Sequence, residues 1–222
     1  MIRAEDVGIL YEDASVLVVN KPSGLLSEYH EAEPSVPFLL SSHQAGSFPL
    51  TPITRLDRGV TGVMLLAKTK KAAAFLSERV ADHSLFEKEY RAVVSGRMEE
   101  KEGELHDLLF KDSAKNKTFV VKRMRRGVKE AALSYRALTE REAGEGYVSL
   151  VSVRLHTGRT HQIRVQFASR RHPILGDGKY GGTSGYPLAL HAFSLAFPHP
   201  SGKRMSFTAS LPTGNPWSIF CK

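Results

Sequence analysis

The chain has 222 residues, of which 41% are hydrophobic and 24% are charged, a composition typical of globular proteins that excludes a wholly disordered chain. Its length predicts a single domain over residues 1–222, in which two tightly joined α+β halves are possible. The single cysteine, Cys221, excludes an internal disulfide framework and a cysteine-based zinc site.

Basic residues outnumber acidic residues by 31 to 23, which gives a net charge of +8. This excess favours a polyanionic partner, and nucleic acid over a membrane surface. Two segments concentrate the positive charge: residues 122–129, which contain no acid, and residues 154–179, where Asp177 is the single acid. The N-terminus lacks an export signal, and no aliphatic run approaches the length of a membrane span. We therefore expect a cytoplasmic protein, with a monomer as the default state.

Hydrophobic patterning predicts a chain made mostly of strands with few helices. The predicted strands, in chain order, are 16–20, 61–67, 87–95, 118–122, 131–138, 147–155, 190–197 and 204–210. The predicted helices are 35–44, 70–83 and 160–169. Because strands mostly follow strands, the pattern predicts an α+β fold with a mixed, largely antiparallel sheet and a few flanking helices.

Several familiar site motifs are absent or fail in context. Residues 176–181 spell G-x-G-x-x-G, but Pro173 precedes them and Gly182, Gly185 and Pro187 follow, so a tight loop is expected instead of a dinucleotide site. The nine histidines show no metal-ligand spacing, and neither a phosphate-binding P-loop nor a serine nucleophile motif occurs. The sequence therefore predicts neither a metal nor a cofactor.

Asp57 stands out because Arg55 and Arg58 flank it in a glycine-containing turn just before a buried strand. One interpretation is a turn-capping aspartate that pairs locally with arginine. The other is a carboxylate kept ionised by its neighbours, which can act as a nucleophile or stabilise an oxocarbenium-like centre.

A second cluster gathers basic and amide side chains where the third predicted helix begins. The cluster consists of Arg159, His161, Gln162 and Arg164. Donors at a helix N-terminus are suited to contact an anion, although a solvated basic face would show the same pattern. Ile163 and Phe167 predict that the helix packs, so the adjacent Arg164 would need an anionic partner if it were buried.

Taken together, these motifs resemble those of the RluA family of RNA pseudouridine synthases, in the same order and nearly end to end. The resembling segments are 18–25, 55–62, 88–92, 158–164, 172–177 with Tyr180 and Gly181, and 190–192 with His199 and Pro200. The resemblance implies the pseudouridine synthase catalytic fold, an RNA substrate, no cofactor and no metal. The implied reaction breaks the N1–C1′ bond of uridine, turns the uracil and rejoins it through C5.

The resemblance also implies roles for individual residues. Asp57 matches the catalytic aspartate, and two routes stay open for it, attack at C1′ or abstraction of a ribose proton. Tyr90 matches the active-site tyrosine that stacks on the target base and assists proton transfer at C5. Arg164 matches the basic residue that pairs with the aspartate, and Arg55 matches the arginine near the flipped-out nucleotide. Arg159, His161 and Gln162 are candidates for RNA contact and base flipping.

The Asp57 motif departs from the family pattern at three places, one of which is the pair Gly59 and Val60, and the choice of RNA stays open. Thr54 stands where a histidine is usual, and Thr61 stands where a serine is usual. We expect no N-terminal S4-type domain, so RNA selection would depend on loops, with residues 28–52 and 111–129 as candidates. Ribosomal and transfer RNA are both possible substrates. The alternative function is a non-catalytic RNA-binding or remodelling protein on the same fold, and a glycosidase is disfavoured because Asp57 has no evident acidic partner in sequence.

Overall fold

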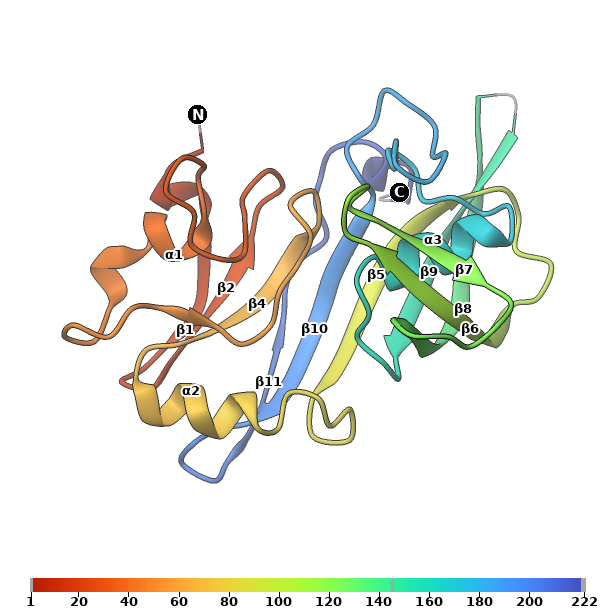
Figure 1. Ribbon diagram of the computed structural model, residues 1–222. Coiled ribbons are helices and arrows are strands. Elements are labelled where there is room, and N and C mark those ends of the chain that lie inside the picture. Colours follow the sequence, from red (N-terminus) through yellow and green to blue (C-terminus); the bar gives the residue numbers. More distant parts are fainter. Residues whose placement is uncertain (1, 145, 221–222) are drawn as a thin grey trace. The chain divides into compact units, whose positions relative to one another are not determined.

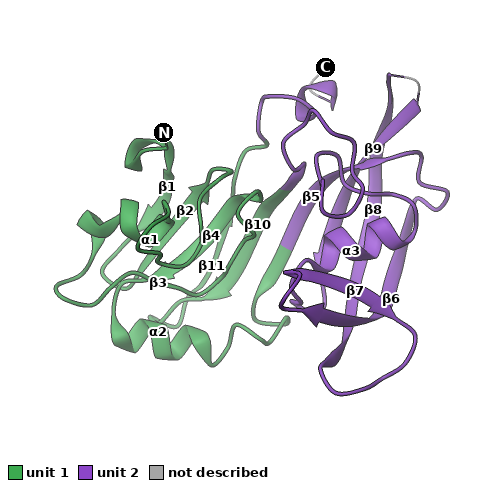
Figure 2. Cartoon of the chain, turned by 45° about the horizontal axis from the view of Figure 1, so that its top comes forward, with its two compact units in different colours: residues 1–88, 191–211 green, residues 89–190, 212–222 purple. Residues whose placement is uncertain are grey.

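The computed structural model describes residues 2–144 and 146–220, so Cys221 lies outside the described residues. The chain divides into two compact units, which are coloured separately in Figure 2. Unit 1 contains residues 1–88 and 191–211, and unit 2 contains residues 89–190 and 212–222.

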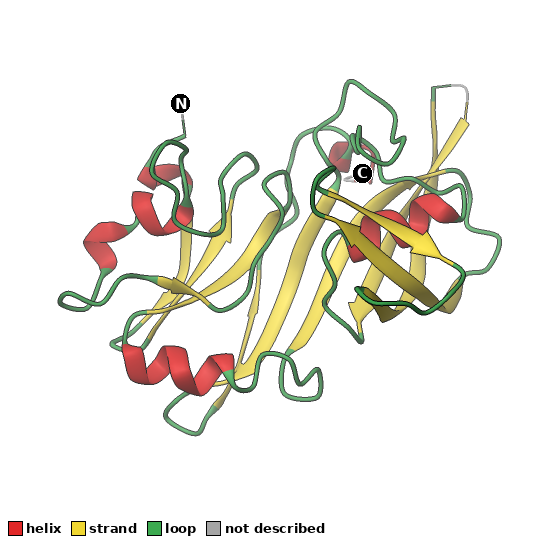
Figure 3. Ribbon diagram, viewed as in Figure 1, coloured by secondary structure: helices red, strands yellow, loops and turns green. Residues whose placement is uncertain are grey.

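Strands dominate both units, as Figures 1 and 3 show. The strands are β1 (Gly8–Glu12), β2 (Val16–Lys21), β3 (Thr51–Pro52), β4 (Thr61–Ala67), β5 (Glu87–Ser95), β6 (Glu102–Asp112), β7 (Lys117–Val121), β8 (Val128–Ala143), β9 (Gly146–Leu155), β10 (Leu190–Pro198) and β11 (Arg204–Thr208). The helices are α1 (Val36–Leu39), α2 (Lys70–Ser77) and α3 (Gln162–Ser169), with short 3₁₀ turns at Ala4–Asp6, Ser41–His43 and Trp217–Phe220. The predicted α+β class with a largely antiparallel sheet is confirmed.

In unit 1, four strands lie in the order β1-β2-β4-β10, while β3 pairs with β4 and β11 pairs with β10. The pairs are antiparallel except that of β4 with β10, which is parallel. Strands β2 and β4 are buried almost without interruption, and apart from Asn20 and Lys21 at the end of β2 their residues are mostly apolar, as expected for central strands. The core also takes Leu76 from α2, together with Phe86 and Phe197, whose rings stack at 6.0 Å.

Helix α2 begins where predicted but ends early. The Thr69 side chain accepts a hydrogen bond from the Ala72 amide and so caps the helix. The predicted end at residue 83 is wrong, because after Ser77 the regular helical pattern gives way to turns in which the Arg79 and Val80 amides both bond to the Leu76 carbonyl.

Gly62 allows β4 and β10 to approach closely. Its φ of +112° is a conformation that residues with a side chain rarely adopt, and a Cβ there would lie 2.2 Å from the Ala192 carbonyl oxygen. Any other residue would separate the two strands at the point where the Asp57 segment enters the sheet.

In unit 2, the strands lie in the order β5-β9-β8-β6-β7, and each neighbouring pair is antiparallel. Helix α3 packs on one face of this sheet. Phe167 of α3 meets the Tyr135 ring edge-on at 5.7 Å, and Val165 packs with Leu109 and Ala131.

Three strands were not predicted from the sequence: β1, the two-residue strand β3, and β6. β1 is a short edge strand with a bulge, and its residues are exposed or half-buried, so it lacks the pattern of a buried strand. β6 was hidden because Asp107 occupies one of its core-facing positions, where Gln166 and Arg170 of the α3 region bond to it at 2.8 Å each. The predicted strand 118–122 is confirmed as β7, and the segment 111–129, a candidate for RNA selection, also contains the end of β6 and the start of β8.

Within residues 2–144 and 146–220, no helix is long and apolar enough to cross a membrane. Over the same residues, no group of three or more His, Cys, Asp or Glu side chains is arranged to hold a metal ion.

Candidate active site

In unit 1, the loop that carries Asp57 is fixed by the turn that follows β2. Ser27 Oγ donates to the Leu56 carbonyl at 2.7 Å and accepts from the Leu56 amide at 2.9 Å. The Gly24 amide donates to the Arg58 carbonyl at 2.8 Å. The loop closes on itself when the Val60 amide donates to the Asp57 carbonyl at 2.9 Å. Asp57 therefore sits, half-buried, on a backbone whose neighbouring residues are bonded on both sides.

Lys21, at the end of β2, lies fully buried beneath this loop. Its ammonium has three N–H groups, and they donate to the carbonyls of Pro22, Arg58 and Val60 at 3.0, 3.1 and 2.9 Å. Burial lowers the pKa of Lys21 to about 8, while the negative charge of Asp57 acts in the opposite direction. The site thus contains a positive charge held near Asp57 by backbone carbonyls.

Lys21 lies within a segment that resembles the family, but no role for it was predicted from the sequence. The available signal was a lysine that ends an apolar strand directly before a proline-containing turn. Such a lysine is buried only when its charge is satisfied, so its position already pointed to partners elsewhere in the chain.

The two arginines beside Asp57 both form ion pairs with glutamates of the preceding segment. Arg55 pairs with Glu28 at 3.0 Å, and about two-thirds of each side chain is exposed. Arg58 pairs with Glu33 and also donates from Nε to the Gly24 carbonyl at 3.0 Å. Arg55 thus stays largely exposed to solvent, whereas Arg58 also fastens the loop.

Two of the departures from the family pattern, Thr54 and Thr61, form hydrogen bonds that stabilise unit 1. Thr54 is buried, and its Oγ1 accepts a hydrogen bond from the Leu65 amide at 2.9 Å. Thr61 Oγ1 lies 2.7 Å from Nδ1 of His191, its partner in the β4–β10 register. Both threonines therefore stabilise the strand that follows the Asp57 loop.

In unit 2, Tyr90 lies on the same face of the sheet as α3. It pairs with Val153 of β9, and Val153 pairs with Tyr135 of β8. Residues opposite one another in register share a face, and the Tyr135 ring contacts Phe167 of α3. Tyr90 and Arg164 are therefore both associated with the helix-covered face.

Arg164 is buried and forms a two-pronged ion pair with Asp177. Its Nε donates to Oδ2 at 2.7 Å and its Nη2 donates to Oδ1 at 2.8 Å, and the Asp177 side chain is fully buried. The predicted need for an anionic partner is confirmed, and Asp177 fills it. The predicted pairing of Arg164 with Asp57 joins residues of different units and stays a prediction.

The loop that carries Asp177 is the one that spells G-x-G-x-x-G, and the expected tight turn is confirmed. Gly176 has φ of +74°, and a Cβ there would lie 2.1 Å from the Pro187 carbonyl oxygen. The glycine thus permits a close backbone contact. A dinucleotide site would need a helix that begins within this motif, and in the described residues the motif is followed by turns and then by β10.

Tyr180 links the start of α3 to strand β7. Its Oη accepts from the Thr118 amide at 2.8 Å and lies 2.9 Å from Nδ1 of His161. Burial raises the pKa of Tyr180, and the Arg164 guanidinium lies 5.2 Å from the centre of its ring. The helix itself begins at Gln162, two residues later than predicted, because His161 has a left-handed backbone with φ of +54°.

Gln162 and Arg159 differ in what they offer to RNA. Gln162 is buried, and its Oε1 accepts from Thr157 Oγ1 at 2.7 Å and from the Arg159 amide at 3.0 Å, while its Nε2 donates to the Ala132 carbonyl. It therefore shapes the turn before α3. Arg159 is exposed and bonded through Nε to the Glu130 carbonyl, which leaves its outer nitrogens for an anion.

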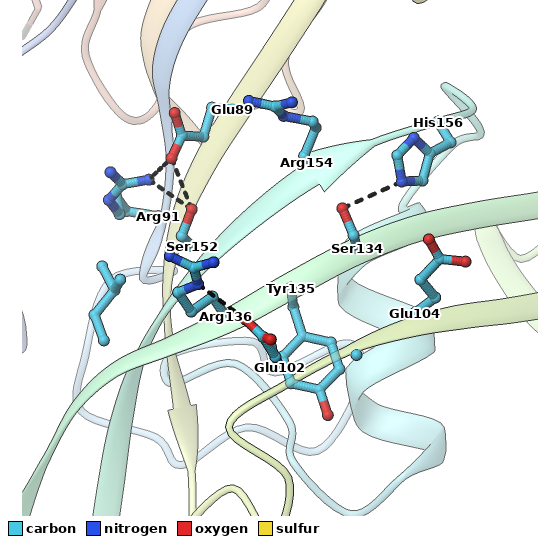
Figure 4. Close-up of a pocket in the computed structure, with 12 residues that line it drawn as sticks. Glu89, Arg91, Glu102, Glu104, Ser134, Tyr135, Arg136, Ser152, Arg154 and His156 are labelled. Atoms are coloured by element: carbon cyan, nitrogen blue, oxygen red, sulfur yellow. Dashed lines mark hydrogen bonds and ion pairs between the residues drawn. The ribbon is translucent and has the colours of Figure 1, made fainter.

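The opposite face of the unit 2 sheet has a polar hollow of about 740 Å³, shown in Figure 4. Its charges are largely paired with one another: Glu89 bonds to Arg91 and Ser152, and Arg136 bonds to Glu102. The hollow contains none of the residues predicted for the site, and Glu89 and Arg91 point away from the face on which Tyr90 lies. It is a self-paired polar surface.

Comparisons with known proteins agree with the motifs. The family model for RNA pseudouridylate synthase matches residues 15–169. Ribosomal large subunit pseudouridine synthase D of Zymomonas mobilis is 35% identical over 227 residues, which cover 92% of this chain and 69% of that protein. Uncharacterized RNA pseudouridine synthase YjbO of Bacillus subtilis is 34% identical over 212 residues, which cover 92% of this chain and 72% of that protein.

A solved structure supports the fold. Human RNA pseudouridylate synthase domain containing 1 aligns with a TM-score of 0.78 over 100% of this chain and 89% of that chain, at 23% identity. The predicted RluA-family membership is confirmed by the family match and the named relatives. The chain therefore belongs to the RNA pseudouridylate synthase family and is an isomerase that converts uridine in RNA to pseudouridine.

Proposed function

We propose that Asp57 is the catalytic carboxylate of this isomerase. The observation that carries the proposal is how firmly the Asp57 loop is held. The loop is hydrogen-bonded to the 21–27 turn, and the Lys21 ammonium lies buried beneath it. A group that reacts at a ribose carbon must be held in place and yet be reachable, and Asp57 is half-buried on a fixed backbone. The Lys21 ammonium, bonded to the carbonyls of Arg58 and Val60, holds the backbone that directly follows Asp57.

Tyr90 and Arg164 serve the same uridine in this proposal. A base stacked in RNA must leave its stack before C1′ can be reached, at a cost of a few kcal/mol. An aromatic side chain such as Tyr90 can recover part of that cost by stacking on the extruded base. Arg164, held by Asp177, is a fixed cation suited to an anionic group of the site.

Ribosomal RNA is the proposed substrate class. The support is the relative named ribosomal large subunit pseudouridine synthase D, which shares 35% identity over 92% of this chain. Transfer RNA, the other predicted substrate, serves as the comparison in the test. The monomeric state and the cytoplasmic location stay predictions from the sequence.

The test measures tritium released from RNA labelled at uracil C5, because rejoining through C5 displaces that hydrogen. Wild-type protein and D57N are incubated with ribosomal and with transfer RNA that lack the modification. We expect release from ribosomal RNA by the wild type and a loss of at least about a thousandfold in D57N. The matched control is E31Q, which removes an exposed carboxylate of the segment before the same loop and should retain activity.

Release by D57N at the wild-type rate would show that another group does the chemistry. Tritium release confined to transfer RNA would overturn the proposed substrate class. Binding of both RNAs by the wild type without release from either would favour the alternative of a non-catalytic RNA-binding protein.

A further inference from the structure

One of the two strongly basic segments of the chain is a hairpin. Residues 111–129, here called the basic hairpin, hold eight of the 31 basic residues and one of the 23 acidic residues. The hairpin therefore has a net charge of +7, more than the +5 of residues 154–179, which hold six basic residues and one acid. The cations are Lys111, Lys115, Lys117, Lys122, Arg123, Arg125, Arg126 and Lys129. In Figure 1 the hairpin lies around β7, at the edge of the unit 2 sheet.

These cations differ from the other basic residues in their partners. Across the described part of the chain, the ion pairs with carboxylates use cations outside the basic hairpin, such as Arg55, Arg136 and Arg204. All of the hairpin cations are exposed except Lys117, which is half-buried. A cluster of like charges without carboxylates costs folding free energy through repulsion, so its presence indicates an external polyanion.

Exposed aromatic surface accompanies the charge. Phe119 lies on the edge strand β7 with 36% of its surface exposed, and it pairs in register with Phe110 of β6. The ammonium groups of Lys115 and Lys117 lie 6.0 and 5.7 Å from the centre of the Phe119 ring. The guanidinium of Arg125 lies 5.0 Å from the centre of the Phe110 ring. Aromatic rings between cations are typical of surfaces that stack bases and contact phosphates.

We propose that the basic hairpin is a second RNA-binding surface, separate from the target uridine. Its cations contact phosphates of the substrate RNA, and Phe119 stacks on an unpaired base of the same strand. This proposal depends on the proposed function only in that the ligand is the RNA substrate. Because phosphate contacts carry no sequence information, the hairpin supplies affinity while base stacking adds a preference for unpaired RNA.

The hairpin is also fastened to the start of α3. The Thr118 amide donates to Tyr180 Oη at 2.8 Å, and Thr118 Oγ1 donates to the Thr160 carbonyl at 2.9 Å. Lys179 Nζ donates to the Asn116 carbonyl at 2.7 Å. RNA bound on the hairpin is therefore held by a rigid support next to Arg159 and His161, so the surface can position the strand as well as retain it.

The first experiment measures the affinity of a fluorescein-labelled oligouridine of about twelve nucleotides by fluorescence anisotropy between about 50 and 200 mM KCl. The variant R123Q/R125Q/R126Q should bind about tenfold or more weakly at the lowest salt concentration. Each phosphate contact to a single strand contributes about 0.7 to the slope of log K against log salt. The slope should therefore become shallower by about two in the triple variant.

Two matched variants show whether a loss of affinity comes from the basic hairpin itself or only from the lower net charge of the protein. K70Q/K71Q/K203Q removes three exposed cations of unit 1 and should bind like the wild type. R123K/R125K/R126K keeps the charge in place and should keep the slope. Equal weakening in both glutamine variants, or no weakening in the hairpin variant, would overturn the proposal. The affinity for oligouridine is measured without turnover. The test of the basic hairpin therefore does not depend on whether Asp57 is the catalytic residue, and D57N should bind oligouridine like the wild type even if it is inactive.

The stacking step is tested by F119A against F119Y. Removing the ring should weaken oligouridine binding by about fivefold or more without changing the salt slope, because stacking releases no counterions. F119Y retains a ring and should restore the affinity. Unchanged binding by F119A would refute the stacking role, and a changed slope would show that the substitution disturbs the cations instead.

Discussion

The Asp57 loop and the basic hairpin are both rich in positive charge, but the structure treats that charge in opposite ways. Around Asp57, Arg55 and Arg58 hold glutamates, and Lys21 is buried among three carbonyls. In the hairpin, the cations face solvent without carboxylate partners among the described residues. Positive charge near the candidate chemistry fixes the backbone, whereas positive charge on the hairpin is left for a ligand.

This contrast separates two uses of the same residue types. A cation that is paired within the fold helps to hold the neighbouring chain in place, and it adds little to the electrostatic potential far from the protein. An unpaired and exposed cation contributes field and counterion release, and it adds little to the stability of the fold. The net charge of +8 therefore does not by itself show where a polyanion would bind, because paired and unpaired cations contribute to it equally.

The largest expected effect on stability comes from the buried pair in unit 2. R164A removes one partner and leaves the fully buried Asp177 carboxylate without its guanidinium. We expect the free energy of unfolding to fall by about 3–5 kcal/mol, measured by urea denaturation. R136A is the matched control, since its pair with Glu102 is about 70% exposed and should cost less than about 1 kcal/mol.

A similar loss in R164A and R136A would contradict the distinction between buried and exposed pairs. The result also bears on the assay of Arg164, because a variant that unfolds loses activity for reasons unrelated to chemistry. The conservative variant R164K keeps the charge and loses the two-pronged geometry, so it separates the two causes.

An intermediate effect is expected from the pH dependence of Lys21. Its folded pKa of about 8 lies below its ordinary value of 10.5, so between these values the folded protein binds fewer protons than the unfolded chain. The difference in unfolding free energy between wild type and K21M should therefore increase, in favour of the wild type, by about 3 kcal/mol as pH rises through this range. Below pH 8 both states carry the charge and the difference is flat.

Urea denaturation of both proteins at pH values from about 7 to 10 measures this difference. Groups other than Lys21 titrate in both proteins and largely cancel. A difference that does not change with pH would show that the buried ammonium keeps its ordinary pKa.

The smallest effect on stability is expected in the hairpin. R123Q/R125Q/R126Q removes three exposed cations, and each substitution should change the unfolding free energy by less than about 0.5 kcal/mol. Thermal or urea denaturation at low salt checks this value. A loss comparable to that of R164A would show that these arginines hold the fold together, which would undermine their assignment to RNA.

Much of the fold was predictable where one face of a segment is apolar. The strands 61–67 and 87–95 were predicted with their observed bounds, and α3 was displaced by two residues at its start. β6 was not predicted, because Asp107 interrupts its apolar face and only Gln166 and Arg170, about sixty residues away, make that position acceptable. The early end of α2 was also missed, since apolar residues continue past Ser77.

The candidate site was predicted as separate residues and not as an arrangement. The resemblance pointed to Asp57, Tyr90 and Arg164, and their roles in the reaction stay proposals. Sequence alone did not show that Lys21 supports the Asp57 loop or that Asp177 holds Arg164. It also did not show that Gln162 is buried, because a glutamine at a helix start looks the same whether it contacts RNA or its own backbone.

By itself, the sequence determined the fold class, the family and the amount of positive charge, because these depend on local patterns and on motifs whose order can be read along the chain. Tertiary structure decided which charges are paired and which are free. That outcome depends on distant residues, such as Glu28 for Arg55 and Asp177 for Arg164, being brought within about 3 Å. Whether such an ion pair stabilises or destabilises the fold depends on how deeply it is buried, and burial is a property of the folded chain.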